Sequence, residues 1–370
     1  MSKIINFYAL NKYVAKIAYN QMINTMKSLR SVFTFALVAL FATTAYALGS
    51  DNEEQDTRTE AVMAYNNAQE LVSSNNHLDA IEMYREALDL ARSADCEDCG
   101  DIVDRIESEV PRVYFSRASA AFQRFRNERS VEAAEESIEF FQEAAEAGQE
   151  FGDAQVSERS TAVIPQIYYN KSLVEYNMDN HSAAIASLDR AIELNANYTL
   201  AYYQKAIVLN NSGAALEEVL EWFDNAIEVG QRVGDNENVE RAQRRAGGEL
   251  VYQAVQRIDE ARMADALRML NRAEQYVPNS VDLHYRYAEV YNDRGNFNSA
   301  IEHANRALEL ETGGVTDRAK IYFELGIAYK ALEQIEQACS AFENAAYGSF
   351  RDPALHELEY ELECEGYASR

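Results

Sequence analysis

The feature that most constrains the fold is a spacing of small and large residues that recurs along the chain. In residues 321–345, Gly326 is followed twelve residues later by Ala338, and Phe342 and Ala345 follow after four and three more residues. The same spacing recurs in four other stretches: Ala68, Ala80, Tyr84 and Ala87; Ser172, Ala184, Leu188 and Ala191; Ala254, Ala266, Leu270 and Ala273; Ala288, Ala300, Ala304 and Ala307. Such internal self-similarity is typical of arrays of small stacked units.

The pattern within each unit predicts two antiparallel helices. Apolar residues recur mostly at i, i+3, i+4 and i+7, alternating runs are scarce, and the chain holds only 4 prolines and 15 glycines. A hydrophobic content of 47% argues against a disordered chain. Small residues let two helices approach closely, and the large residue fills the space between helix pairs. We therefore expect an all-α protein.

These residues resemble the tetratricopeptide repeat, a helix–turn–helix unit of 34 residues. The resemblance covers residues 61–351, and the seven expected units start near Ala61, Arg112, Pro165, Thr199, Gly247, Val281 and Ala319. The unit at Thr199 needs one inserted residue and the unit at Arg112 needs about six, the family's tryptophan is missing, and only Pro278 keeps the inter-repeat proline. The resemblance implies a right-handed superhelical solenoid of about seven repeats, in which each repeat needs its neighbours to bury its apolar face.

The N-terminal 47 residues differ from the rest, because they hold five basic residues and no acidic one. Residues 26–47 have two charges, an apolar run and the small-x-small pattern of Ala45 and Ala47, which predicts a secretory signal peptide cleaved after Ala47. Residues 1–25 are then an extension from an upstream start codon, and residues 48–60 an acidic linker. An uncleaved anchor is the alternative, but the apolar run is shorter than the roughly 20 residues of a membrane span. We expect an exported protein, periplasmic or secreted, with no stable membrane span after cleavage.

The charge of the mature chain argues against a nucleic-acid partner. Removing the five N-terminal bases from 34 leaves 29 basic against 61 acidic residues, a net charge of −32. Phosphate binding needs an excess of Lys and Arg on one face. One local exception is "RFRNERS", residues 124–130, where Arg124, Arg126 and Arg129 form a basic patch. The patch could dock an acidic partner or form salt bridges within its loop, and we favour the second interpretation.

Four cysteines in an exported chain are expected to form disulfides, and pairing Cys96 with Cys99 and Cys339 with Cys364 is the simplest of three connectivities. A redox or zinc role for Cys96 and Cys99 is disfavoured by the neighbouring acids and by the lack of a second ligand pair. Residues 352–370 are predicted to form a capping helix and tail. Asp352 is the expected N-cap and Pro353 the first helical residue.

Enzyme signatures are missing from the sequence, which contains no GxSxG, P-loop, GxGxxG or HExxH motif. The five histidines, His77, His181, His284, His303 and His356, are scattered and are expected to be structural or solvated. We therefore expect a non-enzymatic protein with no catalytic residues, no metal and no cofactor.

The resemblance implies a concave groove lined by the second, fifth, ninth and twelfth positions of each first helix. The fifth positions are Tyr65, Ser116, Tyr169, Tyr203, Val251, Tyr285 and Phe323, and polar twelfth positions are Tyr176, Asn210 and Asn292. Aromatic rings with hydroxyls suit an extended peptide or a glycan. The alternative is that these rings pack against the adjacent repeat. The groove lacks the repeated Lys/Asn/Arg set with which chaperone-binding members hold a terminal carboxylate.

The leading hypothesis is an exported scaffold or adaptor that binds an extended protein segment in this groove. A cell-envelope assembly factor or a glycan-binding module using the same groove is the second hypothesis. An enzyme accessory subunit or a cryptic hydrolase is the third, and it is disfavoured because nothing converges on a nucleophile or a metal.

Overall fold

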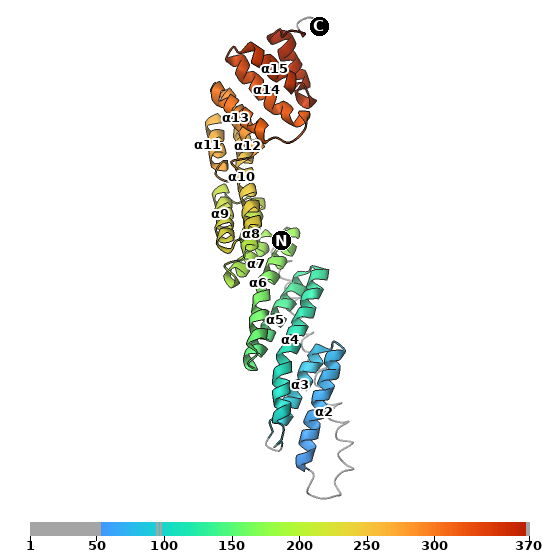
Figure 1. Ribbon diagram of the computed structural model, residues 1–370. Helices are drawn as coiled ribbons and strands as arrows, with labels where there is room; N and C mark the ends of the chain where they lie inside the picture. The colour runs from blue at the N-terminus through green and yellow to red at the C-terminus, as the bar shows by residue number, and fades with distance from the viewer. Residues whose placement is uncertain (1–52, 94–95, 97, 368–370) are drawn as a thin grey trace, which may run out of the picture. The chain divides into compact units, whose positions relative to one another are not determined.

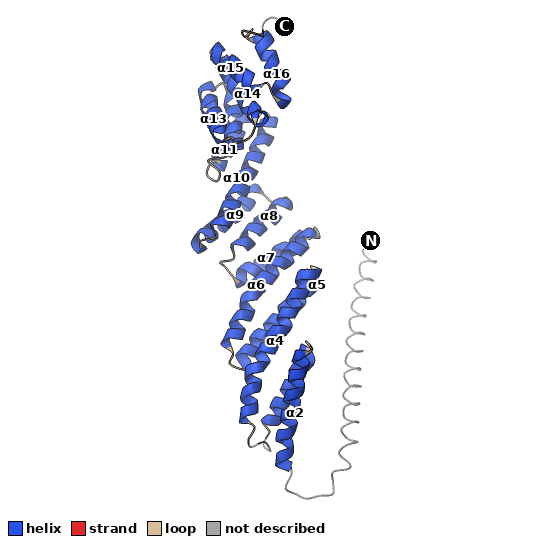
Figure 2. Ribbon diagram, turned by 45° about the vertical axis from the view of Figure 1, so that its right-hand side comes forward, coloured by secondary structure: helices blue, strands red, loops and turns tan. Residues whose placement is uncertain are grey.

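The structure is a computed structural model that describes residues 53–93, 96 and 98–367. The predicted upstream extension, the signal peptide and the first residues of the predicted linker lie outside the described residues. Among the described residues, every regular element is helical and none is a strand (Figure 2). The all-α prediction is confirmed.

Seven consecutive helical hairpins follow one another within the described residues (Figure 1). Their helices are α2 (Glu53–Ser73), α3 (His77–Ala91), α4 (Gly100–Glu128), α5 (Val131–Glu150), α6 (Ala154–Asn177), α7 (His181–Leu194), α8 (Thr199–Asn211), α9 (Leu216–Val233), α10 (Asn236–Asp259), α11 (Met263–Ala273), α12 (Val281–Asp293), α13 (Phe297–Leu310), α14 (Val315–Ala331) and α15 (Ile335–Ala345). A turn of 3₁₀-helix (Gly348–Phe350), α16 (Arg351–His356) and a π-helical turn (Glu357–Glu361) complete the chain.

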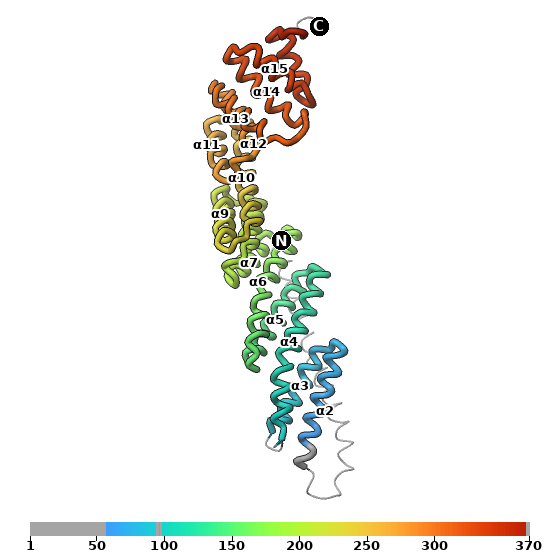
Figure 3. Tube along the Cα trace, viewed as in Figure 1, coloured from blue at the N-terminus to red at the C-terminus, as the bar shows by residue number. Residues whose placement is uncertain are grey.

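The chain divides into two compact units, residues 1–110 and 111–370. In the described part of the first unit, the hydroxyls of Tyr65 and Tyr84 both donate hydrogen bonds to the Glu109 carboxylate, at 2.9 and 2.6 Å, and so tie α2 and α3 to the start of α4. In the second unit, successive helices from α5 to α15 pack on one another, as the trace in Figure 3 follows. The first helices α6, α8, α10, α12 and α14 also contact each other in turn. This arrangement is a helical repeat array.

The predicted frame of small and large residues coincides with the buried contacts between paired helices. Each member of the five stretches except Ser172 and Gly326 is an apolar residue no more than 1% exposed, and those two are also buried. Gly326 shows why the position must be small, because an added Cβ would lie 2.7 Å from Cε1 of Phe342. The spacing therefore predicts the helix–helix contacts and not only the helices.

The second repeat starts one residue earlier than predicted. In the third repeat, which starts at Pro165, the third and eighth positions are fully buried. In the second repeat the corresponding buried residues are Val113 and Ala118. The predicted eighth residue, Ser119, is only half-buried. The frame therefore begins at Pro111, and its fifth position is Phe115 instead of Ser116. The extra residues of this repeat lengthen its helices, which only Arg129 and Ser130 separate, and this hid the register from the sequence spacing.

Two first helices are longer than predicted, since α6 and α10 begin eleven residues before Pro165 and Gly247. The cause is a motif that recurs after 82 residues: "EAGQEFGDAQVSER" (146–159) and "EVGQRVGDNENVER" (228–241) share seven of fourteen residues. In each copy a glycine with φ of +73° or +77° ends one helix, and an aspartate caps the next. Gly148 and Gly230 allow close approach, because a Cβ there would lie 2.7 and 2.6 Å from the following helix.

The two ends of the array differ from their predicted boundaries. Helix α2 begins at Glu53, so the predicted linker at 48–60 is partly helical, and Arg58 on this extension forms an ion pair with Asp101 at 3.4 Å. Helix α16 begins at Arg351, and Phe350, not Asp352, is the N-cap, because a 3₁₀ turn leads directly into the helix. Asp352 instead lies in the first turn, where an acid favours the helix dipole.

The C-terminal segment covers the last hairpin. Ala354, Leu358 and Cys364 are buried against the cluster of Ala338 and Phe342 from α15. None of the helices formed by residues 53–93, 96 and 98–367 is long and apolar enough to cross a membrane.

Candidate binding surface

The fifth-position rings pack inside their own repeats. Tyr65 contacts Tyr84 with ring centroids 5.7 Å apart, and the same pairing of a fifth-position ring with the large residue of the second helix recurs three times: Phe115 with Phe141 at 5.7 Å, Tyr203 with Phe223 at 6.0 Å, and Phe323 with Phe342 at 5.4 Å. Tyr65 is only 9% exposed and Tyr285 only 7% exposed. The alternative that these rings pack within the array therefore accounts for one face of the fifth-position rings, which are together called here the aromatic ladder.

A cation from the following repeat covers three of these rings. Arg159 lies over Phe115 at 4.7 Å, Arg241 over Tyr203 at 5.0 Å, and Lys320 over Tyr285 at 4.7 Å. Arg159 and Arg241 are the final residues of the two copies of the 82-residue motif. These cation–π contacts link alternate repeats to their neighbours.

The remaining predicted ring, Tyr169, packs against Tyr198 at 5.4 Å, and burial raises the pKa of its hydroxyl. Burial likewise raises the pKa of Tyr285. Both hydroxyls are therefore protonated at neutral pH.

The predicted polar residues at the twelfth positions bridge successive first helices. Tyr176 accepts a hydrogen bond from Asn211 at 2.5 Å, and Asn210 donates to Glu249 at 3.1 Å. Asn292 is buried and donates to the backbone carbonyl and the carboxylate of Glu324, at 2.9 and 2.8 Å. Each of these three residues thus bonds to a residue of the following repeat that the sequence frame had not singled out, and these bonds lie within the array.

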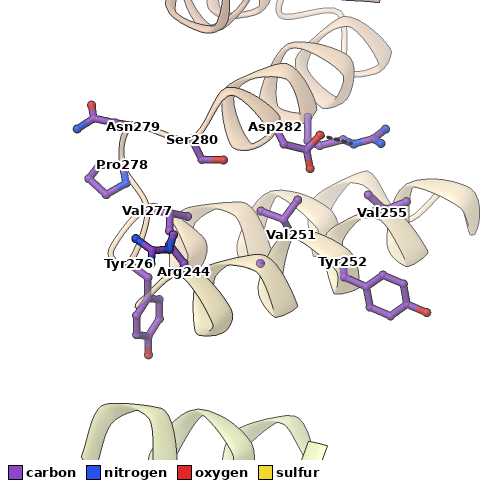
Figure 4. Close-up of a pocket in the computed structure, with 12 residues that line it drawn as sticks. Arg244, Val251, Tyr252, Val255, Tyr276, Val277, Pro278, Asn279, Ser280 and Asp282 are labelled. Carbon is purple, nitrogen blue, oxygen red and sulfur yellow. Dashed lines mark ion pairs between the residues drawn. The ribbon is translucent and has the colours of Figure 1, made fainter. Parts of the chain in front are cut away.

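An open cleft lies where α10 faces the start of α12 (Figure 4). Its volume is about 810 Å³. Val251 and Val255 project from α10 toward the first turn of α12, and the turn between α11 and α12 closes one end. Gly248, Val251 and Val255 occupy the second, fifth and ninth positions of their repeat, and Asp282 the second position of the next. The cleft is therefore part of the predicted groove, and this cleft, with its turn from Tyr276 to Ser280, is called here the α10 cleft.

Tyr252 is the residue of the α10 cleft that the sequence frame missed. It is 57% exposed and lines the cleft from α10, with its ring turned away from α12 (Figure 4). It occupies the sixth position, outside the groove frame, so the sequence alone offered no reason to select it. The charged rim is neutralised internally, because Arg286 pairs with Glu289 at 2.8 Å and with Asp282 at 3.9 Å.

Two histidines hold the turn that closes the α10 cleft. His284 Nε2 lies 2.9 Å from the Pro278 carbonyl, and its Nδ1 lies 3.0 Å from Nδ1 of His303. Since the carbonyl can only accept, His284 donates from Nε2 and accepts from His303 when both rings are neutral. Burial is the main cause that lowers the pKa of His303, so this neutral arrangement is favoured. These two predicted structural histidines are thus positioning residues for the turn.

The four cysteines lie as the simplest connectivity predicts. The sulfur atoms of Cys96 and Cys99, and those of Cys339 and Cys364, are within bonding distance, with Cα atoms 5.6 and 5.9 Å apart. Within the described part of the chain, no group of three His, Cys, Asp or Glu side chains is placed to hold a metal ion.

Family profiles for the tetratricopeptide repeat match residues 165–198, 257–313 and 319–347. These matches fall on the same hairpins whose small and large residues meet in the structure. The chain is a tetratricopeptide repeat protein. The fold of this family serves as a scaffold for protein–protein interaction.

The chain is similar, at 20% identity or below, to the following solved structures. YrrB, described as having an unusual peptide-binding site, is 20% identical over 51% of this chain and 89% of its own, with a TM-score of 0.32. MamA from Desulfovibrio magneticus RS-1 is 19% identical over 49% and 92%, with a TM-score of 0.33. The TPR2AB domain of yeast Sti1, in a complex with pHSP90, is 13% identical over 82% and 96%, with a TM-score of 0.30. No curated protein matches the chain.

Proposed function

We propose that this tetratricopeptide repeat protein is a non-enzymatic exported scaffold that binds an extended segment of a partner protein, with the α10 cleft as its main contact. The observation that carries the proposal is the chemistry of that cleft. Val251 and Val255 provide an apolar floor, Tyr252 an exposed ring, and Asn279 and Ser280 a polar end. A concave apolar site with a few convergent polar groups is the usual form of a binding site.

The aromatic ladder has a different role in this proposal from the one first predicted. Phe115 and Tyr203 each contact a ring of their own second helix and an arginine of the next repeat. In this proposal these contacts set the spacing between repeats. The contact with the partner falls instead on side chains that are still accessible, Tyr252 foremost. Tyrosine in such a place offers a flat apolar surface and a hydroxyl at low entropic cost.

The test is a binding assay with peptides selected from a display library on the mature wild-type protein. The double variant Tyr252→Ala/Val255→Asn should weaken binding of the selected peptides at least tenfold. Tyr360→Ala/Met178→Asn is the matched control, because both residues are 68% exposed and neither lines the α10 cleft. Equal binding by both variants would place the contact elsewhere. A glycan array that binds the wild type but not the Tyr252 variant would favour the glycan alternative.

Export is part of the same proposal and rests on the pattern of residues 26–47 and on the two cysteine pairs. Expression of the full chain with its N-terminal region intact should yield a protein whose first residue is Leu48. Mass spectrometry of the purified protein measures this directly, and a chain that retains residues 26–47 would support the anchor alternative.

A further inference from the structure

A second cleft, of about 580 Å³, lies between the last turns of α4 and the C-terminal half of α6, in repeats two and three. Phe122 and Leu173 give it an apolar wall, and Phe122 is only half-buried. The amides of Gln166, Asn170 and Asn177 line the α6 side. This surface is called here the α4–α6 cleft.

The charge of the α4–α6 cleft is opposite to that of the molecule. Arg126 and Arg129 line it, and no carboxylate does, although the whole chain carries a net charge of −27. Of the predicted basic patch, only Arg124 forms an ion pair, with Glu136. Arg126 and Arg129 are exposed, and neither has an ion-pair partner among the residues that the structure describes. The expected salt bridge is therefore formed by Arg124 alone, and residues 124–128 belong to α4 and not to a loop.

The positions of the two arginines follow from the insertion in repeat two. Arg126 lies in the last turn of α4, which ends at Glu128, and Arg129 directly follows the helix with a positive φ of 50° before α5 begins. They are thus held at the end of a long helix, next to an apolar wall. In the α10 cleft, by contrast, Arg286 is already paired with acids of its own helix.

We propose that the α4–α6 cleft binds an acidic side chain, Asp or Glu, of a partner polypeptide that also carries an apolar residue beside it. A guanidinium fork matches a carboxylate in geometry and charge, so two free forks beside one cleft favour that ligand. Phe122 and Leu173 would contact the apolar neighbour, and the three amides would bond the partner's backbone. The proposal goes beyond the α10 cleft and does not require that cleft to be a binding site.

The experiment uses the mature protein and a position-scanning library of N-acetylated, C-amidated octapeptides, so that no terminal charge contributes. Peptides with Asp or Glu next to Leu or Phe should bind at least tenfold more tightly than their Asn or Gln counterparts, as measured by fluorescence polarisation. Arg126→Gln/Arg129→Gln should abolish this preference. Arg126→Lys/Arg129→Lys keeps the charge without the fork and should retain only part of the preference.

Arg294→Gln/Arg351→Gln is the control, since both arginines are exposed, have no ion-pair partner in the described chain and lie outside the α4–α6 cleft. It removes the same charge and should leave the preference unchanged. No preference for acids at any position, a preference that survives Arg126→Gln/Arg129→Gln, or an equal loss in the control would each overturn the proposal. Tyr252→Ala should leave the acidic preference intact, which separates this test from that of the α10 cleft.

Discussion

At the scale of single residues, close packing of two helices requires a residue without a side chain at certain positions. Gly326 and Gly248 are both helical glycines, but they have opposite surroundings. A Cβ on Gly326 would meet the ring of Phe342, whereas a Cβ on Gly248 would meet no atom within 4 Å. Glycine costs helix stability at both positions, so only the first has a packing reason to be kept.

This contrast predicts opposite effects of one substitution. Gly326→Ala should lower the free energy of unfolding by about 1–3 kcal/mol, because it overpacks the contact between α14 and α15. Gly248→Ala should raise it by about 0.5–1 kcal/mol through helix propensity alone. Urea unfolding measures both. Adding Phe342→Leu to Gly326→Ala should remove part of the overpacking, and purely additive effects of the two changes would contradict the proposed contact.

A second residue-scale prediction concerns Glu324, a buried acid of α14 that faces α12. Burial is the main cause that raises its pKa to about 7, and Asn292 donates a hydrogen bond to it. The pKa of Glu324 is higher in the folded state than in the unfolded state. Its contribution to the free energy of unfolding is therefore complete below about pH 4.5 and is lost as the pH rises through 7. Glu324→Gln keeps the acceptor without the charge. It should be more stable than the wild type at pH 8, by up to about 3 kcal/mol at 1.4 kcal/mol per pKa unit.

The measurement is urea unfolding of both proteins between pH 4 and pH 8. Their difference in unfolding free energy should grow across this range. Glu343→Gln, at an exposed position of α15, is the control for the loss of one negative charge. If the difference in unfolding free energy between Glu324→Gln and wild type does not change with pH, Glu324 is not protonated in the folded state as described here.

At the scale of elements, spacing within a hairpin was predictable and spacing between hairpins was not. The frame from Gly326 to Ala345 recurs because every hairpin makes the same internal contact. The early starts of α6 and α10 depend on a separate motif. The extra residues within the helices of the second repeat shifted the predicted fifth position from Phe115 to Ser116. The bridges from Asn210 and Asn292 depend on what the next repeat presents, so the sequence of one repeat cannot reveal them. The accessibility of Tyr252 likewise depends on the neighbouring repeat and cannot be read from its own.

The two cysteine pairs give a prediction at this scale. Cys339 and Cys364 are 25 residues apart and join α15 to the C-terminal segment, whereas Cys96 and Cys99 are 3 residues apart. By the chain-entropy model, removing the first bond with Cys339→Ala/Cys364→Ala should cost about 3 kcal/mol, and removing the short one should cost about half as much. Denaturant unfolding of the oxidised proteins measures both losses. Free thiols in the oxidised wild type, found by titration, would contradict the pairing.

At the scale of the whole molecule, the binding surface depends on the packing of the repeat array. In the second unit, each first helix contacts the next, so the surface these helices present is continuous only while neighbouring repeats stay packed. Rings, cations and amides along the array are used to hold it together. The α10 cleft and the α4–α6 cleft are two places where accessible groups meet, and they have different chemistry. A partner segment that is apolar at one place and acidic at another would suit both.

The most direct test of the central claim is site-specific photo-crosslinking in the cells that produce the protein. A benzophenone amino acid is placed at Tyr252 in the α10 cleft and, separately, at the exposed Tyr360 as a control. The account predicts a discrete crosslinked protein partner from position 252 and none from position 360. Crosslinks of equal yield from both positions, or none from position 252 in cells where the protein is functional, would contradict it.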